Sequence, residues 1–361
     1  MKPQLFDGPV GVFGLGLIGG SVALALRERF LVGEVHGYDP SPQSRDDALN
    51  VGAVDVVHDQ LGPWITDLQA GILAAPVGEL IALGRQLAPY ASASSAWTDV
   101  GGVKAPVVDG LHGLLPNFVG GHPMAGSEHA GCANAKAALL ENAVWVLTPH
   151  PETPWGQVDR IKAMIDAIGA YPLLLNAGLH DRLVARVSHL PYLLAVALTL
   201  MVGRDRDHEQ LMFLAAGGFR DLTRVASGSP RMSRDMVAVN RSAIKDALGD
   251  LRQMLDRLDG LLDSPESLLG DAREAKATRD ALPVVRRSLL PRMYDVVVSL
   301  PDRPGELARL TGACAEGGVN IRDIEVLTIR EEGEAIRLGF HTPEERDAAR
   351  VVLRNAGYET R

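Results

Sequence analysis

One histidine of this sequence stands among residues that let a backbone come close to a ligand. It is His122, in Gly120-Gly121-His122-Pro123-Met124-Ala125-Gly126-Ser127-Glu128. A neutral imidazole can accept a proton or hydrogen-bond a hydroxyl group near neutral pH. The glycines permit tight turns, and Pro123 fixes φ directly after the histidine. We predict that His122, which follows the short expected strand Asn117–Val119, is a catalytic base. The alternative is an ordinary loop histidine.

A second histidine lies in an apolar segment that we expect to be helical, from His180 to Gly203. Pro191 lacks a backbone donor and clashes with the preceding turn, so a break or kink is expected near Ser188 and His189. His189 and Tyr192 are three residues apart and therefore share a helical face. This break is a candidate site, although a buried core histidine would fit the same pattern.

Two arginines follow a pair of glycines, in the stretch from Ala215 to Gly228. Arg220 and Arg224 alternate there with acidic and hydroxyl residues, directly after Gly217 and Gly218. A guanidinium group donates two parallel hydrogen bonds to a carboxylate. The segment is therefore a candidate for recognising a carboxylate substrate, and a solvated charged turn is the alternative.

A strand, a glycine-rich turn and a helix open the chain and are typical of a dinucleotide site. Val10–Phe13 has the composition of a buried strand, and the next expected strand ends at Asp39. The glycines allow the turn, the approach of a pyrophosphate and close packing of helix on strand. An acid at Asp39 favours NAD over NADP. The predicted cofactor-binding residues, including those at the ends of later strands, are Gly14, Leu15, Gly16, Leu17, Ile18, Gly19, Asp39, Ala75, Pro76 and Asp99.

Length and composition limit the class of protein. A chain of 361 residues exceeds the roughly 250 to 300 at which single cores stop growing, so two or three domains are expected. The formal charge of -9 disfavours binding to nucleic acid or to an anionic membrane. Cys132 and Cys314 form neither a disulfide framework nor a metal-ligand pair, which favours a cytoplasmic protein. The apolar run Leu190–Val202 is shorter than the ~20 residues of a membrane span, and we expect a buried helix.

The order of the patterns predicts three domains. Strands and helices alternate over residues 1–151, which predicts an α/β Rossmann domain with a parallel sheet. Helical periods dominate residues 152–291, where long amphipathic helices over about 236–262 and 265–282 favour packing between subunits of a homodimer. Residues 293–361 read as strand, helix, strand, strand and helix, with a short final strand at Tyr358 and Glu359.

Four of these motifs, in this order, resemble the prephenate dehydrogenase family and its arogenate-using relatives. They are Gly14–Ser21, Gly121–Glu128, Val187-Ser188-His189-Leu190-Pro191 and Gly218–Arg224. The resemblance implies a Rossmann domain joined to an all-α dimerisation domain, with the active site between them. It implies NAD-dependent oxidative decarboxylation of prephenate to 4-hydroxyphenylpyruvate in tyrosine biosynthesis, driven by aromatisation and without a metal. It also implies that His122 deprotonates the ring hydroxyl, Arg224 binds a carboxylate and His189 supports the site.

The sequence departs from the family's pattern at two substrate contacts. Gly102 stands where many members have a serine, and Tyr192 stands where many prephenate-specific members have a second histidine. Both changes leave the choice between prephenate and arogenate open, and we favour prephenate. The predicted substrate-binding residues are Gly102, Ser127, Ser188, Tyr192, Gly217 and Arg220.

The last domain resembles the ACT domain, a small α+β (ferredoxin-like) module that commonly binds amino acids. The resemblance implies feedback control by an aromatic amino acid, tyrosine first and phenylalanine second, and a purely structural role is the alternative. The predicted regulatory-ligand residues are Asp302, Arg303, Pro304, Gly305, Glu306, Asn320 and Ile321.

Three other functions remain open from the sequence. An arogenate dehydrogenase would make tyrosine directly. A dehydrogenase of small 3-hydroxy acids also joins a Rossmann domain to helices, but it does not explain the loop around His122 or the amino-acid module. A non-catalytic sensor of NAD and an amino acid would lack the base, yet His122 is present.

Overall fold

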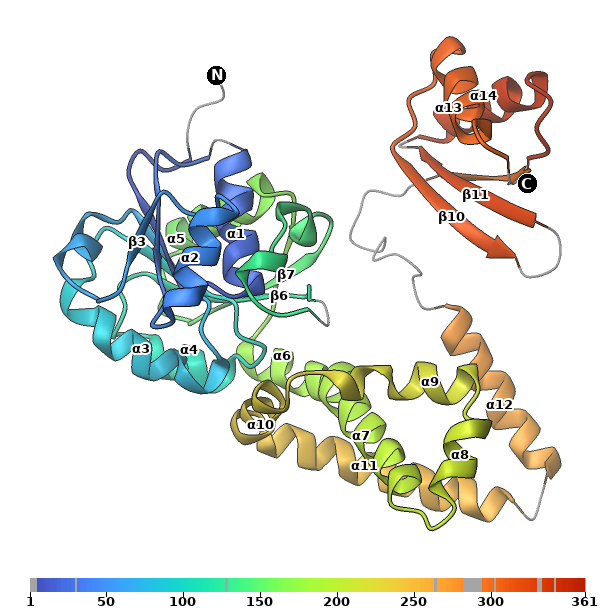
Figure 1. The fold of residues 1–361 in the computed structure, drawn as a ribbon, viewed down its shortest axis with the longest axis horizontal. Coiled ribbons are helices and arrows are strands. Elements are labelled where there is room, and N and C mark those ends of the chain that lie inside the picture. The colour runs from blue at the N-terminus through green and yellow to red at the C-terminus, as the bar shows by residue number, and fades with distance from the viewer. Residues whose placement is uncertain are drawn as a thin grey trace. The chain divides into compact units, whose positions relative to one another are not determined.

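The computed structural model describes residues 5–29, 31–126, 129–262, 265–281, 294–301, 303–329, 333–340 and 342–360, except the side chains of residues 265, 323, 325–329 and 333–335. The chain divides into two compact units, Met1–Leu269 and Gly270–Arg361 (Figure 1). Each unit is described by itself.

An eight-stranded sheet forms the first half of the larger unit, in the order β3-β2-β1-β4-β5-β6-β7-β8. Strands β1 to β6 run parallel, β7 is antiparallel to β6, and β8 is parallel to β7. The chain leaves β1 for β2 on one side and returns to β4 on the other, which creates the switch point where such sheets bind ligands. The strands are β1 Val10–Phe13, β2 Val35–Tyr38, β3 Val56–His58, β4 Ala70–Leu73, β5 Ala96–Asp99, β6 Phe118–Pro123, β7 Val144–Pro149 and β8 Tyr171–Leu174.

Helices cover both faces of this sheet. One core cluster joins Val22 and Leu26 to Ile161 and Ile165, and a second joins helices α3 and α4 to the opposite face. The predicted α/β Rossmann domain is thereby confirmed. The helices are α1 Leu17–Glu28, α2 Pro42–Asn50, α3 Leu80–Leu87, α4 Ala105–Leu111 and α5 Trp155–Ala167, with short 3-10 turns η1 Pro63–Asp67, η2 Val77–Glu79, η3 Ala88–Tyr90, η4 Cys132–Asn134 and η5 Ala137–Leu140.

The sheet extends further along the chain than the sequence patterns indicated. Helix α5 and strand β8 follow residue 151, where we expected the first domain to end, yet β8 pairs with β7 from Val144↔Tyr171 to Leu147↔Leu174. The change to helical periods at Trp155 reflects one more helix covering the sheet. The expected boundary at residue 151 therefore lies inside the α/β part.

The second half of the larger unit is helical. The expected break near Ser188 is a π-helical turn, η6 Ala185–His189, between α6 Ala177–Val184 and α7 Leu190–Gly203. The helix that we expected to run through residues 236–262 is interrupted at Asn240. The further elements are α8 His208–Leu214, α9 Gly217–Thr223, η7 Arg224–Ser227, α10 Pro230–Val239 and α11 Arg241–Leu261, followed by α12 Pro265–Asp280, most of which lies beyond Leu269 and so in the smaller unit.

The smaller unit contains an antiparallel sheet in the order β10-β11-β9. Val296, Leu310 and Leu353 contribute to its own core. The predicted order of strands and helices is confirmed, while the expected final strand is a single bridge, Val298↔Thr360. Its elements are β9 Tyr294–Leu300, α13 Glu306–Glu316, β10 Asp323–Ile329, β11 Gly333–Phe340 and α14 Pro343–Asn355. Both cysteines, Cys132 and Cys314, are free and buried.

Candidate active site

The three glycines of the first turn have the geometry that a dinucleotide requires. Gly14 has φ +110°, and a Cβ added there would lie 2.5 Å from the carbonyl carbon of Ala74 at the end of β4. A Cβ on Gly19 would lie 2.0 Å from the Gly14 carbonyl oxygen, so only glycine lets α1 pack this closely. A Cβ on Gly16 would meet nothing within 4 Å, which leaves open space at the N-terminus of α1. The turn therefore fits a pyrophosphate against the helix N-terminus.

Asp39 lies at the end of β2, next to this turn. Its Oδ2 accepts a hydrogen bond from the amide of Leu15 at 2.8 Å, and its Oδ1 accepts one from the amide of Ser41 at 2.9 Å. The Arg45 guanidinium donates to the Asp39 carbonyl oxygen at 2.7 Å. The carboxylate is thus held beside the fingerprint turn, in the position expected for the ribose-binding acid.

Of the other expected cofactor residues, Ala75 and Pro76 follow β4 at the switch point, whereas Asp99 is buried at the end of β5. Its carboxylate accepts from the amides of Gly101 (2.8 Å) and Gly121 (2.9 Å) and pairs with Lys104. These contacts show that Asp99 organises the neighbouring backbone.

His122 lies within strand β6, whereas we expected a shorter strand, Asn117–Val119, that ends before it. It is paired with Val146 of β7. The glycines before it serve close packing, since a Cβ on Gly121 would lie 2.4 Å from the Asp99 carbonyl oxygen and one on Gly120 would lie 2.5 Å from Thr148 Oγ1. Small residues here let β6 approach its neighbours, and the sheet fixes the direction of the imidazole.

A buried ion pair holds the strand just before His122. Lys104 Nζ pairs with Asp99 and donates to the Gly121 carbonyl oxygen at 2.8 Å, while the Gly121 amide donates to Asp99. Both side chains of the pair are fully buried. Burial lowers the pKa of the Lys104 ammonium group, and the nearby Asp99 carboxylate opposes that shift. Because both backbone groups of Gly121 are bound, the pair anchors the position from which His122 projects.

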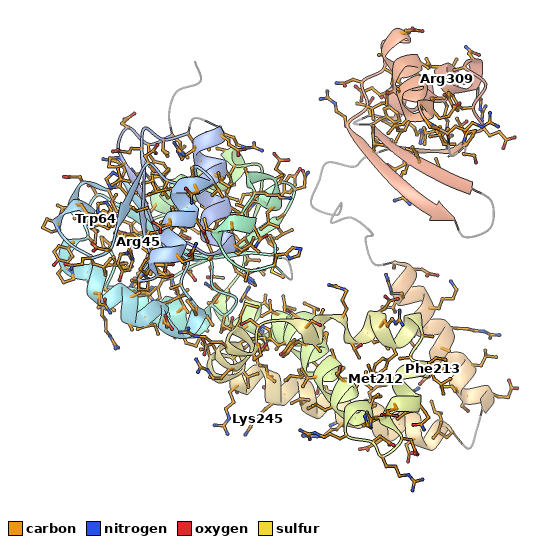
Figure 2. The ribbon with its side chains drawn as sticks, in the orientation of Figure 1. Arg45, Trp64, Met212, Phe213, Lys245 and Arg309 are labelled. Atoms are coloured by element: carbon orange, nitrogen blue, oxygen red, sulfur yellow. The ribbon has the colours of Figure 1, made fainter. Side chains whose placement is uncertain are left out.

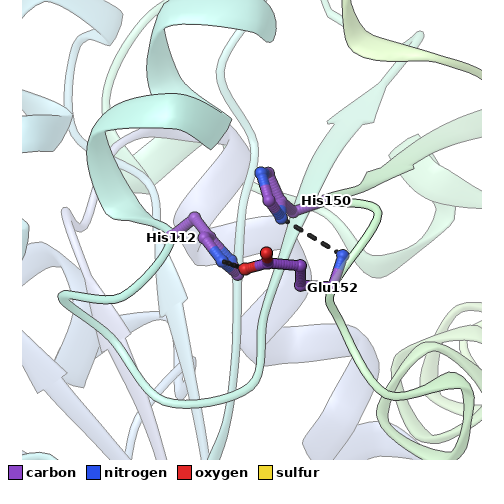
Figure 3. A group of neighbouring side chains, drawn as sticks. All are labelled: His112, His150 and Glu152. Carbon is purple, nitrogen blue, oxygen red and sulfur yellow. Dashed lines mark hydrogen bonds and ion pairs between the residues drawn. The ribbon is translucent and has the colours of Figure 1, made fainter.

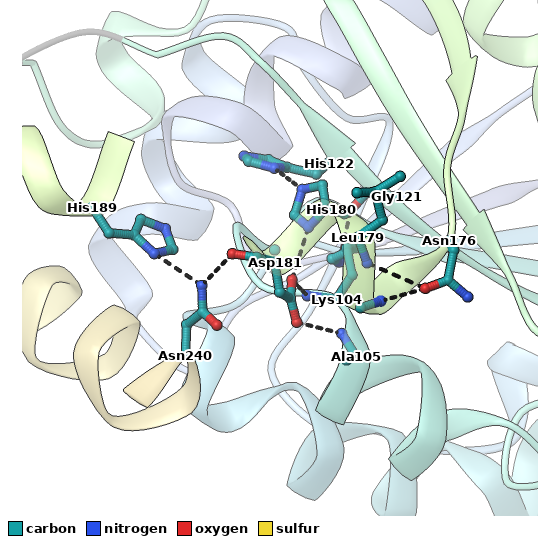
Figure 4. Close-up of polar contacts among 12 residues, drawn as sticks. Lys104, Ala105, Gly121, His122, Asn176, Leu179, His180, Asp181, His189 and Asn240 are labelled. Carbon is teal, nitrogen blue, oxygen red and sulfur yellow. Dashed lines mark hydrogen bonds and ion pairs between the residues drawn. The ribbon is translucent and has the colours of Figure 1, made fainter. Parts of the chain in front are cut away.

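A chain of hydrogen bonds runs from His122 into the helical part (Figure 4). His122 Nδ1 lies 2.8 Å from His180 Nε2, and His180 Nδ1 lies 2.8 Å from Asp181 Oδ1. The Asp181 carboxylate also accepts from the backbone amides of Lys104 at 2.7 Å and Ala105 at 2.8 Å. We call His122, His180 and Asp181 the histidine relay. Helix α6 thus touches both His122 and the start of α4.

The relay determines which nitrogen of each imidazole carries a proton when both rings are neutral. Asp181 Oδ1 accepts a hydrogen bond from His180 Nδ1–H, so in the neutral ring His180 Nε2 carries no hydrogen and is an acceptor. His122 Nδ1 must then donate to it, and His122 Nε2 becomes the nitrogen that can take up a proton. In this arrangement the Asp181 carboxylate orients His122 through His180, as a carboxylate orients the histidine in sites that use a general base.

His189 joins the same network through Asn240. The Asn240 amide donates to the Asp181 carbonyl oxygen at 2.9 Å and lies 3.1 Å from His189 Nδ1. Burial lowers the pKa of His189 to about 4, so its ring is neutral at physiological pH. With Nδ1 accepting, His189 Nε2 carries a hydrogen that it can donate. The interruption of the helix at Asn240 places this amide between Asp181 and His189.

Gly102 faces His122. A Cβ added to Gly102 would lie 3.7 Å from His122 Nε2, at ordinary van der Waals distance. A serine in this position would therefore hold its hydroxyl beside His122 Nε2. This chain has no side chain there, so the space beside His122 Nε2 is larger.

The other expected substrate residues that the structure describes lie along η6, α7, α9 and η7. Arg220 and Arg224 are exposed, and a Cβ on Gly228 would lie 3.9 Å from the Tyr192 ring. Turn η7 packs on α7, the helix that begins directly after His189. Ser188 and Gly217 are exposed, and Ser127 lies outside the described residues.

The smaller unit places most of its expected ligand residues around the start of α13. Gly305, with φ +90°, caps this helix, and Arg303, Pro304 and Asn320 are exposed. Glu306 is half-buried and bonded to Arg309 at 3.2 Å, and Ile321 packs against the core. Asp302 lies outside the described residues.

The helical part exposes a large apolar surface. Phe213 is 90% exposed, and Met212, Leu214 and Met201 are also exposed (Figure 2). Helix Ala177–Gly203 is long and apolar enough to cross a membrane by length and composition, with 22% of its most apolar window buried. The expectation of a buried helix is wrong for the single chain. An exposed apolar surface of this kind is typical of a subunit interface.

Sequence models of three known domains match the chain. Residues 22–173 match the nucleotide-binding domain of prephenate dehydrogenase, and residues 176–268 match its dimerization domain. Residues 294–352 match the ACT domain. The residues that match the dimerization domain include the exposed apolar helices, which supports a homodimer.

Known relatives agree with these matches. The chain is 33% identical to prephenate dehydrogenase of Bacillus subtilis over 356 residues, covering 96% of each chain. Prephenate dehydrogenase from A. aeolicus, solved with hydroxyphenyl propionate and NAD+, superposes with a TM-score of 0.75 at 29% identity, over 78% of this chain and all of that one. Synechocystis arogenate dehydrogenase gives a TM-score of 0.67 at 30% identity, over 75% and 99%. The chain therefore belongs to the prephenate dehydrogenase family, NAD-dependent oxidoreductases of tyrosine biosynthesis.

Proposed function

We propose that this chain oxidises prephenate in preference to arogenate and that His122 is the base. The observation that carries the role of His122 is the histidine relay, with both of its bonds at 2.8 Å. It leaves His122 Nε2 as the proton acceptor and supports the imidazolium once the proton has arrived. The alternative of a non-catalytic sensor gives no reason for a buried network behind one imidazole.

In the proposed reaction, His122 Nε2 takes the proton of the ring hydroxyl of prephenate. NAD, held at the turn of Gly14, Gly16 and Gly19 beside Asp39, would supply the hydride acceptor for the carbon that carries this hydroxyl. The ring carboxylate leaves as carbon dioxide, its bonding electrons complete the aromatic ring, and the phenolate oxygen so formed takes its proton back from His122 to give 4-hydroxyphenylpyruvate. The buried pair of Lys104 and Asp99 keeps His122 in place during the proton transfer, because it binds both backbone groups of Gly121.

We assign recognition of a substrate carboxylate to Arg224, with Arg220 as the nearest alternative. Both are exposed on α9 and η7, which pack on the helix that follows His189. Prephenate carries two carboxylates and a protein of net charge -9 needs a local cation to hold them. His189, neutral with hydrogen on Nε2, supports the site as a donor rather than as a charge.

Asp39 supports the proposal that NAD is preferred over NADP. Its carboxylate is fixed beside the turn by the amides of Leu15 and Ser41, and a 2′-phosphate would meet a negative charge there. Steady-state kinetics with both cofactors test this directly. A higher kcat/KM with NADP would contradict the assigned role of Asp39.

The choice of substrate is tested by NADH formation with prephenate and with arogenate. Arogenate carries an amino group where prephenate has a ketone. We expect the higher kcat/KM with prephenate. A preference for arogenate would show that the residues around Gly102 and Tyr192 select the amino group, while leaving the role of His122 intact.

We further propose a cytoplasmic homodimer regulated through the ACT domain. Tyrosine is the first candidate effector, bound near Arg303 and the start of α13, and phenylalanine is the second. Calorimetry with the full chain measures this binding. Absence of heat with every aromatic amino acid would leave the domain with a structural role.

A further inference from the structure

A second group of side chains able to bind an ion lies away from the histidine relay. It consists of His112, His150 and Glu152, and one ligand atom of each lies within 4.8 Å of the others (Figure 3). His112 Nε2 is 3.0 Å from Glu152 Oε2, and the two imidazole rings stack with centroids 3.6 Å apart. We call these residues the His112 cluster.

The backbone around the His112 cluster is fixed by its own hydrogen bonds. His112 follows α4, and its amide donates to the Val108 carbonyl oxygen at 2.8 Å. His150 follows β7 and begins a turn in which the Thr153 amide donates to the His150 carbonyl oxygen at 2.9 Å. The buried Thr153 hydroxyl then donates to the Phe118 carbonyl oxygen at 3.2 Å. The structure therefore brings three ligands together from two segments that are distant in sequence.

We propose that the His112 cluster binds one divalent transition-metal ion of the Zn²⁺ type. Two imidazoles and a carboxylate form a common zinc ligand set, whereas Mg²⁺ and Ca²⁺ prefer oxygen ligands. Ligand atoms about 2.1 Å from a tetrahedral zinc ion lie roughly 3.4 Å from one another. His112 and Glu152 are already this close, at 3.0 Å. The ligand atoms of the cluster lie within 4.8 Å of one another, so His150 needs to move by at most about 1.4 Å to reach the roughly 3.4 Å of a zinc site.

The exposure of these side chains allows that movement. The Glu152 side chain is 78% exposed and that of His112 is 30% exposed, so either can rotate without disturbing a core. His150 Nδ1 accepts from the Glu152 amide at 3.2 Å, and coordination through Nδ1 would replace this contact. Water would occupy the fourth position of the ion.

The proposed ion is structural, because it lies at the opposite end of β6 from the base. His150 directly follows Pro149, which pairs with Val119 near the start of β6. His122, near the other end of the same strand, pairs with Val146. The ion would tie the end of α4 to the end of β7 and take no part in hydride transfer.

The test uses the full chain, stripped of metal with a chelator and titrated with ZnCl₂ in a calorimeter. We expect one strongly bound ion per chain and a higher Tm in the presence of zinc. His112→Ala, His150→Ala and Glu152→Gln should each weaken binding at least about tenfold, the lower bound for loss of groups that support a metal site. Their kcat with prephenate should equal that of the wild type.

Two control variants test whether zinc binding depends specifically on the His112 cluster. His208→Ala removes an exposed histidine of the helical part and should bind zinc like the wild type. His122→Asn distinguishes the cluster from the histidine relay. The proposal is overturned if the wild type binds no zinc, if the three cluster variants retain its affinity, or if binding is lost in His122→Asn alone.

Discussion

Replacing His180 by leucine should separate the histidine relay from the rest of the site. His180 is only 1% exposed and lies between His122 and Asp181, at 2.8 Å from each. The Asp181 carboxylate would keep the amides of Lys104 and Ala105 as donors, so the fold should survive. What is lost is the acceptor that fixes His122 Nδ1 and supports the imidazolium.

The expected effect follows from the strength of that one contact. A hydrogen bond to a group that becomes charged contributes roughly 1.5 to 3 kcal/mol, and about 1.4 kcal/mol corresponds to a tenfold change in rate. His180→Leu should therefore lower kcat by roughly 10- to 150-fold. KM for prephenate should stay within about twofold, because the loss appears only after proton transfer.

The assay is NADH formation at saturating NAD, with Tm measured on each variant. His180→Gln, which can still accept through its amide oxygen, should recover part of the lost kcat. In a double-mutant cycle, adding His180→Leu to His122→Asn should cost little more, since the relay acts only through the base. Fully additive losses, or an effect confined to KM, would refute the role assigned to His180.

Further predictions concern pH, substrate contacts and subunits. Burial lowers the pKa of His189 from its ordinary 6.5 to about 4, so between these pH values the unfolded chain binds more protons than the folded one. Up to roughly 3 kcal/mol of folding stability should therefore be present above pH 6.5 and lost as pH falls toward 4. Denaturant titrations at several pH values measure this, and a free energy of unfolding that does not change with pH would contradict it. Gly102→Ser should fold normally and raise kcat/KM for prephenate by up to about tenfold, the effect of one hydrogen bond, in steady-state assays. Phe213→Glu should shift the dimer toward monomer in light scattering, and an unchanged mass would place the interface elsewhere. His122→Asn should lower kcat by about 10² to 10⁴ while NAD binding, measured by calorimetry, stays nearly intact.

The first strand and its turn could be predicted closely because their signal is local. Val10–Phe13 was expected as a strand and is one, and the space around Gly14, Gly16 and Gly19 matches the roles that their spacing indicated. A break near Ser188 and His189 was likewise expected from one proline, and the structure shows that it is a π-helical turn. In both cases a few adjacent residues determine the backbone.

His180 could not be found in the same way. It and His122 are joined by folding across 58 residues, and nothing in the local sequence marks it as a partner of the base. Asn240 was hidden inside an amphipathic pattern that continues on both sides of it. The glycines before His122 were assigned to a turn because glycine serves both turns and close packing, and only the neighbouring strands decide between them.

The π-helical turn Ala185–His189 also has a consequence for the rotational phase of the long helix that contains it. A π-turn holds one residue more than an α-turn, so it shifts every later side chain by about 100° around the axis. In an unbroken α-helix of the same residues, His189 would be rotated by about 100° away from Asn240, and the apolar surface of α7 would rotate relative to α6. The extra residue thus sets the angle between α6, which holds His180, and α7, which carries the exposed apolar surface.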